Sequence, residues 1–512
     1  MSNTNNDPSM DSFLQKLSSR ILDAIASRKR IMVITHSDAD GLVSGSIMAK
    51  AIVRKGGRCL VRVVSDLNPN VLRKVAGEEH DLYIITDMGA GLAGVIDEYI
   101  GKGKGKDWMV IDHHQLPEEE MNDDRVFNAW KFGIDGGVEA CAGTMAYKVA
   151  YALDESNEDL SALAVVAMVA DRQDQGERKS LIGLNADVAD TARELGLLSI
   201  DLDLMLVGRE TRAVHEALAY TSYPYIDGLT WNVDSCYSLL NSIGLRLKED
   251  GRWRTLAEMS SEEKSKIVEA IAMFASSSTS STSSPSTSSS PPPSSSSLSS
   301  SSNSRDASMI VDELIGYVYT LQREDKRSML RDAREFSLML NACARIRRSG
   351  VGIAICMGDR NSMLMEGEII VNEYRRTLRG YINTIMSERW RVVDDGMLAM
   401  VNGDNLIAQD MLGAVSSLLS GSQAFQGRVI VVRTRTDDGM YKFSCRKGLN
   451  CGIDVNLGLL MRECSSRCNG VGGGHVAAAG ARIGADMLDE FLRCVKESVY
   501  KHKGSVGGDA GD

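Results

Sequence analysis

Short apolar runs alternate with helical patterns over the first third of the chain. Four runs predict strands, at residues 30–35, 59–64, 81–86 and 108–111. The stretch 41–54 predicts the first intervening helix, and 162–170 predicts a buried helix. Continuous apolar runs separated by helices are typical of a parallel sheet that is covered on both faces. The pattern therefore predicts an α/β domain with a parallel sheet at its centre.

The rest of the chain follows a different order. Residues 180–275 predict mostly helix, with amphipathic segments at 206–218 and 260–275. Further on, 308–348 and 365–387 predict helices and 352–356 predicts a strand. The runs 428–433 and 440–446 predict a strand pair around the turn Asp437-Asp438-Gly439. A glycine-rich loop at 470–474, an alanine-rich helix start after His475 and a helix at 485–501 complete a predicted second, smaller α/β domain.

A Ser/Thr tract from Ser276 to Ser304, which holds four of the eight prolines, separates the two halves. Such a tract cannot bury enough apolar surface to offset its loss of conformational entropy. We therefore predict a disordered tail at 1–10, the first α/β domain at 11–180, a helical insertion region at 181–275, a disordered Ser/Pro-rich linker at 276–306, a linking helix with the second domain at 307–503, and a disordered tail at 504–512.

Composition narrows the protein class. With 43% hydrophobic and 25% charged residues the chain is globular, and its net charge of −11 argues against a protein that coats nucleic acid by charge alone. The longest apolar run, at 163–170, is too short to cross a bilayer, and the polar start predicts no secretory signal. We expect a cytoplasmic protein whose ten cysteines are free thiols. Cys445, Cys451, Cys464 and Cys468 are close in sequence, but their spacing does not repeat a paired zinc motif.

Acids and histidines gather at the carboxyl ends of the predicted strands. His36, Asp38 and Asp40 follow the first strand, Asp87 the third, and Asp112, His113 and His114 the fourth, while Asp171 follows the buried helix. Singly, an aspartate after a strand is usually a turn or capping residue, and a lone histidine is usually structural. Three of the seven histidines occur here beside carboxylates, and active groups of parallel sheets collect at this edge. The combination predicts a catalytic metal site.

Oxygen and imidazole ligands without thiolate favour manganese or magnesium over structural zinc. Two such cations can activate water and stabilise the leaving oxygen in phosphoryl displacement. Carboxylates crowded into a cleft resist joint ionisation, and divalent cations offset that repulsion. We therefore expect two divalent metal ions as cofactors, with manganese preferred over magnesium.

The same residues resemble known motifs. His36-Ser-Asp-Ala-Asp-Gly41, Thr86-Asp-Met-Gly89, Asp112-His-His114 and Ala170-Asp171 are similar to the successive motifs of the DHH phosphoesterase superfamily. That superfamily includes RecJ-type exonucleases, oligoribonucleases, cyclic-dinucleotide phosphodiesterases and manganese pyrophosphatases. Near the C-terminus, Asn469–His475 and Ser444-Cys-Arg446 resemble the motifs of the DHH-associated domain.

The resemblance implies a role for each residue. His36 and Asp38 would hold one metal, Asp40, His113 and Asp171 the other, and Asp87 would bridge them. Asp112 and His114 are the implied catalytic residues, because Asp112 would orient its neighbour and His114 would face the phosphate. The implied substrate-binding residues are Ser444, Arg446, Gly472, Gly473, Gly474 and His475. Glycine amides could cradle a phosphate, and Arg446 would add a forked contact.

Two locally basic stretches suggest a nucleic-acid partner. Residues 321–350 carry eight Arg/Lys against four Asp/Glu, and residues 374–391 carry five Arg against one Glu. The second stretch includes Tyr374, Tyr381 and Trp390, and this mixture suits single-stranded DNA or RNA, whose bases stack on aromatic rings. A solvated helix face with a few core aromatics explains the same pattern equally well.

The segment Glu335–Arg345 resembles the helix before the second domain of archaeal RecJ-like proteins that associate with the GINS replication complex. This resemblance implies a single-strand-specific exonuclease, acting 5′ to 3′ in DNA replication or repair. Two alternatives stay open, namely an oligoribonuclease or cyclic-dinucleotide phosphodiesterase, and a replisome scaffold with secondary nuclease activity. A complete ligand set argues against a scaffold without catalysis.

Overall fold

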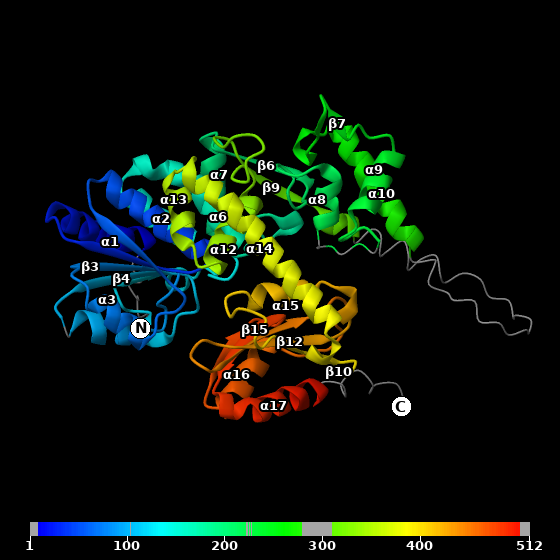
Figure 1. The fold of residues 1–512 in the computed structure, drawn as a ribbon. Helices are drawn as coiled ribbons and strands as arrows, with labels where there is room; N and C mark the ends of the chain where they lie inside the picture. The colour runs from blue at the N-terminus through cyan, green and yellow to red at the C-terminus, as the bar shows by residue number, and fades with distance from the viewer. Residues whose placement is uncertain are drawn as a thin grey trace, which may run out of the picture. The chain divides into compact units, whose positions relative to one another are not determined.

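The computed structural model describes residues 9–102, 104–221, 224, 226, 228–278 and 310–501. They divide into two compact units, with the division between Val371 and Asn372 (Figure 1). Helix α14 (Ser362–Ser387) runs across this division. None of the helices within the described residues has the length and apolar content to cross a membrane.

The first unit contains the predicted parallel sheet. Its strands are β1 (Ile31–His36), β2 (Cys59–Val64), β3 (Leu82–Thr86), β4 (Asp107–Asp112) and β5 (Val126–Asn128), in the order β2-β1-β3-β4-β5, and all neighbours are parallel. The central strands β1, β3 and β4 are almost wholly buried. Because β1, β3 and β4 are adjacent, the residues that follow them meet at one edge of the sheet.

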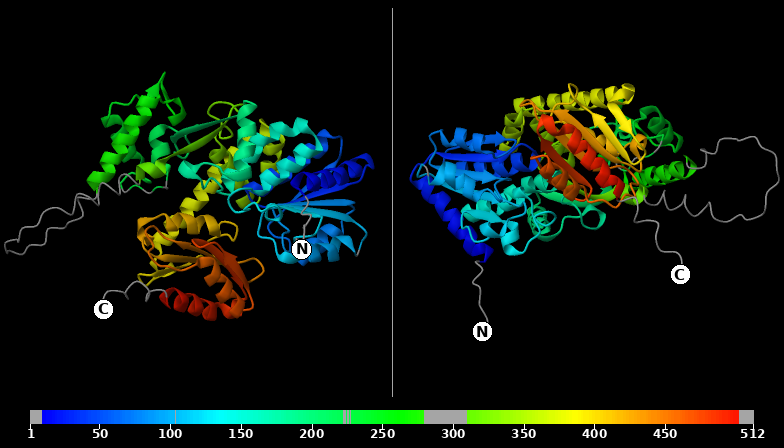
Figure 2. Two further views of the ribbon diagram at one scale, coloured as in Figure 1. Left: turned by 180° about the vertical axis from the view of Figure 1, so that it is seen from behind. Right: turned by 90° about the horizontal axis from the view of Figure 1, so that it is seen from below.

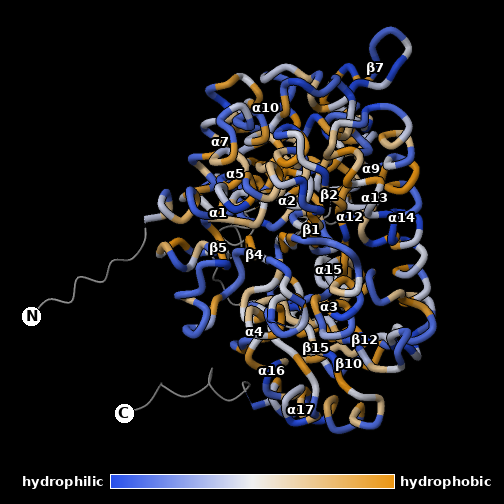
Figure 3. The backbone as a smooth tube through the Cα atoms, turned by 90° about the vertical axis from the view of Figure 1, so that its left-hand side faces the viewer, coloured by the Kyte–Doolittle hydropathy of each residue, from blue (hydrophilic) through white to orange (hydrophobic). Residues whose placement is uncertain are grey.

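Alternate side chains of these strands pack against different helices. One face packs on α3 (Pro69–Ala76) and α4 (Ala93–Ile96) in a cluster that includes Ile34, Tyr83 and Val110. Contacts on the sheet's other side involve α2 (Ala39–Arg54) and α5 (Ala142–Leu153), and α1 (Met10–Ala26) packs on α5. In Figure 3, hydrophobic and hydrophilic stretches alternate along the chain, as expected when helices cover a sheet. The predicted N-terminal α/β fold is confirmed.

The remaining elements of the first unit are mostly helical. They are α6 (Ser161–Ala170), α7 (Gly183–Glu194), α8 (Val214–Tyr220), α9 (Val233–Ser242), α10 (Ser261–Ser278), α12 (Ala333–Arg345) and α13 (Ser349–Met357). Two short antiparallel ribbons accompany them, one of β6 (Leu198–Leu204) with β9 (Ile315–Leu321) and one of β7 (Lys248–Glu249) with β8 (Arg252–Trp253).

The second unit is a mixed six-stranded sheet with helices. Its strands are β10 (Val392–Asp394), β11 (Leu398–Asn402), β12 (Val429–Arg435), β13 (Tyr441–Lys447), β14 (Val471–Gly474) and β15 (Ala478–Ile483), in the order β10-β11-β12-β13-β15-β14. The helices are α15 (Leu412–Ser420), α16 (Leu457–Arg467) and α17 (Leu488–Lys501). One core cluster joins Val431 and Phe443 of the sheet to Met461 of α16 and Phe491 of α17. Figure 2 shows the red helix α17 along the orange strands.

Several predicted elements are wrong in type. The run 352–356 lies in helix α13 instead of a strand, because a short apolar run does not distinguish a strand from a buried helix. The predicted helix at 308–348 contains strand β9, which pairs with β6 in a region that was predicted to be mostly helical. The predicted glycine loop at 470–474 is largely strand β14, and the predicted alanine-rich helix start is strand β15.

The thiol prediction also needs a correction. Cys464 of α16 and Cys494 of α17 are joined by a disulfide, so the expectation of free thiols is wrong for this pair. The eight other cysteines are free. The predicted linker lies outside the described residues from 279 onward, and the predicted tails do so at 1–8 and 504–512.

Candidate metal centre

The eight predicted site residues of the first unit come from three adjacent strand ends and one helix end. His36 ends β1, and Asp38 is the N-cap of α2, where its side chain accepts a hydrogen bond from the amide of Gly41. Asp40 lies in the first turn of α2. Asp87 follows β3, Asp112 ends β4, and Asp171 is the C-cap of α6. Residues separated by 135 positions are thus brought to one edge of the sheet.

One group of possible ligands consists of His36, Asp38 and Asp87. One ligand atom from each lies within 4.8 Å of the others. The His36 Nδ1 atom is 2.7 Å from a carboxylate oxygen of Asp38 and 3.4 Å from one of Asp87. Asp87 is buried, whereas the other two side chains are about one third exposed, so the group opens to solvent on one side.

A second group consists of Asp40, His113 and Asp171, again with ligand atoms within 4.8 Å of one another. The His113 Nε2 atom lies 3.7 Å from Asp40 and 3.4 Å from Asp87, so His113 also adjoins the first group. The Asp40 carboxylate accepts hydrogen bonds from the amides of Ala142 and Gly143 at the start of α5, at 2.9 and 2.7 Å. Those bonds fix the position of the Asp40 carboxylate.

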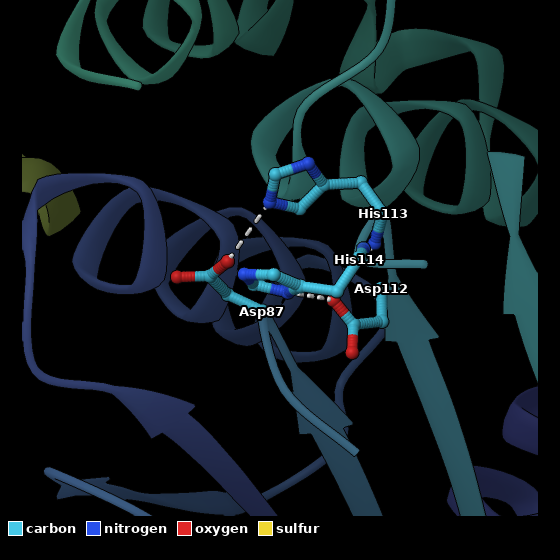
Figure 4. A group of neighbouring side chains, drawn as sticks. All are labelled: Asp87, Asp112, His113 and His114. Carbon is cyan, nitrogen blue, oxygen red and sulfur yellow. Dashed lines mark hydrogen bonds and ion pairs between the residues drawn. The ribbon is translucent and has the colours of Figure 1, made fainter. Parts of the chain in front are cut away.

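Asp87, Asp112, His113 and His114 form a third group (Figure 4). Asp112 is fully buried and accepts hydrogen bonds from the amides of Ala90 and His113. Its Oδ1 atom also lies 2.8 Å from Nδ1 of His114, whose side chain is 59% exposed. This contact fixes the His114 ring through Nδ1 and leaves Nε2 unengaged by Asp112.

Burial and crowded charge raise the pKa values of three of these groups. Burial, together with the Asp87 carboxylate, raises the pKa of Asp40 well above its usual range. Burial also raises the pKa of Asp171 to about 6, against the opposing charge of His113. For His36, burial lowers the pKa, but the charge of Asp38 outweighs it and the pKa is raised well above its usual value. The centre therefore favours added positive charge.

The donor set fits divalent cations. Among the described residues, the buried atoms Nδ1 of His36 and Oδ2 of Asp87 make no hydrogen bond of good geometry, although Nδ1 lies within ion-pair distance of Asp38. They lie 3.4 Å apart, so a shared cation would satisfy both. The groups contain carboxylate oxygens and imidazole nitrogens and no thiolate, which suits manganese or magnesium.

The predicted phosphate-binding residues lie in the second unit. Ser444 of β13 shares a hydrogen bond of 2.7 Å with Ser416 of α15, and Arg446 donates to the carbonyl of Cys445. In the sheet register Ser444 lies opposite Gly480 of β15, and Gly480 lies opposite Gly473 of β14. One row across three strands therefore brings Ser444 and Gly473 into the same part of the sheet, and His475 is exposed beyond the end of β14.

Gly472 has a packing contact that the sequence did not indicate. A Cβ atom on Gly472 would lie 2.5 Å from the carbonyl oxygen of Met461 and 2.6 Å from Oγ of Ser465, both in α16. Glycine at this position permits helix α16 to approach strand β14 closely.

The predicted aromatic stretch 374–391 divides in exposure. Tyr374 is buried in the core, whereas Trp390 is 64% exposed and has the guanidinium of Arg391 4.3 Å from its ring centroid. Only part of this stretch therefore offers an aromatic surface to a partner.

Three further residues support the centre, directly or through a neighbour, and were missed by the sequence analysis. Gln173 donates from Nε2 to Asp171, and Asn185 of α7 donates to Gln173. Asn341 of α12 accepts a hydrogen bond from the amide of Ala39, which lies between Asp38 and Asp40. Asparagine and glutamine have no sequence spacing that marks them as part of a metal site. Of these three residues, only Gln173 had a sequence signal, because it lies two residues after Asp171.

Comparison with known proteins shows three matching family models. The DHH family N-terminal domain matches residues 30–170, the DHH-CID domain 206–284 and the DHHA1 domain 396–501. An uncharacterised protein of Methanocaldococcus jannaschii, MJ0831, is 27% identical over 478 residues, covering 92% of this chain and 93% of the relative. The single-stranded-DNA-specific exonuclease RecJ of Bacillus subtilis is 27% identical over 172 residues, 32% of this chain and 22% of that protein.

Solved structures share the fold. RecJ of Thermus thermophilus in complex with Mn²⁺ has a TM-score of 0.55 at 14% identity, over 96% of this chain and 55% of that one. CDC45 of Entamoeba histolytica has a TM-score of 0.60 at 10% identity, over 96% of this chain and 99% of that one. The chain thus spans about half of the Thermus RecJ and under a quarter of the Bacillus RecJ. With its three matching domains in this order, the chain belongs to the DHH superfamily of phosphoesterases and is a RecJ-like hydrolase.

Proposed function

We propose that this protein is a metal-dependent exonuclease that hydrolyses single-stranded nucleic acid from the 5′ end, acting in the cytoplasm in DNA replication or repair. The observation that carries the proposal is the overlap of three ligand groups at one sheet edge, in which Asp87 and His113 each belong to two groups. Two adjoining sets of oxygen and nitrogen ligands suit a pair of divalent cations that share a bridging carboxylate.

In this proposal His36 and Asp38 hold one manganese ion, Asp40, His113 and Asp171 hold the other, and Asp87 bridges them. The contacts of Asp87 support the bridging role, because one of its oxygens is 3.4 Å from His36 and the other is 3.4 Å from His113. Bound there, the cations would supply an activated water and stabilise charge on the scissile phosphate.

The chain's own groups would orient the substrate. The Asp112 carboxylate fixes the His114 ring through Nδ1, which leaves Nε2 able to donate to a phosphate oxygen. In the second unit, Arg446 and the exposed residues near Gly473 and His475 would bind backbone phosphates.

The test is product analysis with strands labelled at the 5′ or 3′ end. Long single-stranded DNA and RNA, two- to five-residue oligoribonucleotides and a cyclic dinucleotide are each incubated with the protein and Mn²⁺. We expect stepwise release of short products from the 5′ end of long strands. Cleavage of only the short oligonucleotides or the cyclic dinucleotide would instead establish the oligoribonuclease or cyclic-dinucleotide phosphodiesterase alternative.

The matched variants are Asp87→Asn and Asp201→Asn, which remove one carboxylate charge at the centre and on the exposed side of β6, respectively. Asparagine tolerates the positive φ of 60° at position 87, so the fold should persist. We expect Asp87→Asn to lower kcat by more than about 100-fold, beyond the loss typical of ligand-supporting residues. Unchanged turnover in Asp87→Asn would contradict the two-metal proposal.

A replisome partner is the remaining part of the proposal. The fold similarity to CDC45 supports testing association with GINS subunits. Co-purification of tagged protein with GINS at moderate salt is expected, and its absence would restrict the proposal to the nuclease. Catalytic and scaffold roles separate if Asp87→Asn abolishes cleavage but retains the association.

A further inference from the structure

A buried amide lies behind the metal centre. Gln173 follows α6 by three residues and is fully buried. Its Nε2 atom donates to Oδ2 of Asp171 at 2.8 Å and to the carbonyl of Gly136 at 2.9 Å. Both hydrogens of the side-chain amide are therefore donated, one to a predicted metal ligand and one to a backbone carbonyl.

The Gly136 carbonyl connects Gln173 to His113. It lies 2.6 Å from Nδ1 of His113, and because a carbonyl only accepts, Nδ1 carries the proton. The Nε2 atom of His113 faces Asp40 and Asp87, where it can serve as the ligand atom for a cation. A Cβ atom on Gly136 would clash with the carbonyl oxygen of His113, so glycine is needed for this close approach.

Asn185 holds Gln173 from the other side. Its Nδ2 atom donates to Oε1 of Gln173 at 2.6 Å, and its Oδ1 atom accepts from Oγ1 of Thr144 at 2.5 Å. Asn185 and Thr144 are fully buried, on α7 and α5. These bonds determine which way the Gln173 amide faces, since its oxygen is engaged by Asn185 and its nitrogen must therefore face Asp171.

We propose that Gln173, oriented by Asn185, is a positioning residue that sets both Asp171 and the Nε2 atom of His113 for a divalent cation. This inference rests on the proposed metal-dependent function. A buried network with only a structural role would lower stability when broken and leave cation affinity unchanged. A positioning role requires that cation affinity falls, because partners that orient ligands typically contribute 10- to 100-fold to metal binding.

The experiment measures Mn²⁺ binding by isothermal titration calorimetry on the full chain. Gln173→Met retains the side-chain length but removes the amide, and Gln175→Met makes the same change at an exposed position two residues on. We expect Gln173→Met to weaken Mn²⁺ binding by about 10- to 100-fold, and Gln175→Met to bind like the unmodified chain. Circular dichroism without metal checks that each variant is folded.

A second readout separates positioning from chemistry. Exonuclease activity of Gln173→Met should recover as Mn²⁺ is raised, with kcat approaching that of the unmodified chain at saturation. If Gln173→Met does not fold, Asn185→Ser removes the amide that orients Gln173 while leaving Gln173 and Asp171 in place, and the same decrease in affinity is expected.

The outcomes distinguish this inference from the function on which it rests. Normal Mn²⁺ binding by the unmodified chain with equal affinity in the folded variants would overturn the positioning role alone. A chain that binds no Mn²⁺ even when unmodified would overturn the proposed function and the inference together.

Discussion

Asp87 shows how a single residue redirects the chain at the end of a strand. Its φ is 60°, a left-handed conformation that aspartate tolerates better than most residues. Its amide donates to the carbonyl of Ile111 at 3.0 Å, which continues the pairing of β3 with β4 by one residue. The backbone therefore turns while still held by its neighbour, and the carboxylate is placed between His36 and His113.

Glu335 of α12 is a buried carboxylate outside the metal centre. Its oxygens accept hydrogen bonds from the amide of Glu210 and the hydroxyl of Thr211, at 2.9 and 2.7 Å. Burial, with the neighbouring Asp332 charge, raises the pKa of Glu335 to about 7, from the ordinary value of 4.5. The folded state therefore holds this proton more tightly than the unfolded chain does.

The sign of the pH effect follows from that difference. The stabilising contribution of protonated Glu335 is fully present below about pH 4.5 and is lost as the pH rises to about 7. Relative to the unmodified chain, Glu335→Gln should gain free energy of unfolding between pH 5 and 7.5, on the order of 1–3 kcal/mol. Urea unfolding at a series of pH values measures this gain in the free energy of unfolding. The exposed Glu194→Gln is the control, and parallel pH profiles for all three proteins would refute the prediction.

At the scale of elements, the backbone of strand β14 lies in direct contact with the backbone of helix α16. The contact requires glycine on both sides, because a Cβ on Gly458 of α16 would clash with the carbonyl of Gly474. The glycine-rich sequence was interpreted as a phosphate loop, but Gly472 has this structural reason to be glycine. Phosphate binding by Gly473 and Gly474 stays a prediction.

Gly472→Ala should therefore destabilise the second unit. The added methyl meets the Met461 carbonyl at 2.5 Å, and backbone cannot move away as a flexible side chain can. We expect a loss of about 1–3 kcal/mol in the free energy of unfolding. Gly380→Ala in α14, where an added Cβ meets no atom within 4 Å, should be neutral or stabilising by up to about 1 kcal/mol. Equal stabilities of the two variants in chemical denaturation would argue against the packing explanation.

An element was predicted correctly where neighbouring residues determine its structure, and wrongly where contacts between distant residues determine it. Strands β1, β3 and β4 were predicted because each is a continuous apolar run bounded by polar residues. Strand β9 was missed because its pairing with β6 joins residues more than 100 positions apart, such as Leu198 and Leu321. Helix α13 was mistaken for a strand since Gly352 packs against Leu42 of α2, a contact that no local pattern signals.

At the scale of the whole molecule, the chain consists of two compact units with separate cores. The proposed cation ligands all belong to the first unit, and the predicted phosphate-binding residues all belong to the second. Metal binding should therefore stabilise the first unit selectively, because a ligand that binds only the folded state adds to its stability.

Thermal unfolding with and without Mn²⁺ tests this selectivity. At Mn²⁺ concentrations near 100 times Kd we expect about 2.7 kcal/mol of added stability for the first unit, reversed by EDTA. The transition of the second unit should not move, and Asp87→Asn should reduce the shift of the first. A shift of the same size in Asp87→Asn would mean that Mn²⁺ acts elsewhere.

The amino-acid sequence alone established the ligand types and their places at strand ends, because apolar runs and the residues that bound them are local properties. It also indicated that His36, Asp87 and His113 share one edge, since the carboxyl ends of parallel strands lie together. Only the tertiary structure brought Gln173 and Asn185 behind Asp171, paired β6 with β9, joined Cys464 to Cys494, and set Gly472 against α16. Apart from the bond between Gln173 and Asp171, each of these contacts joins segments separated along the chain, and their distances and partners follow from packing.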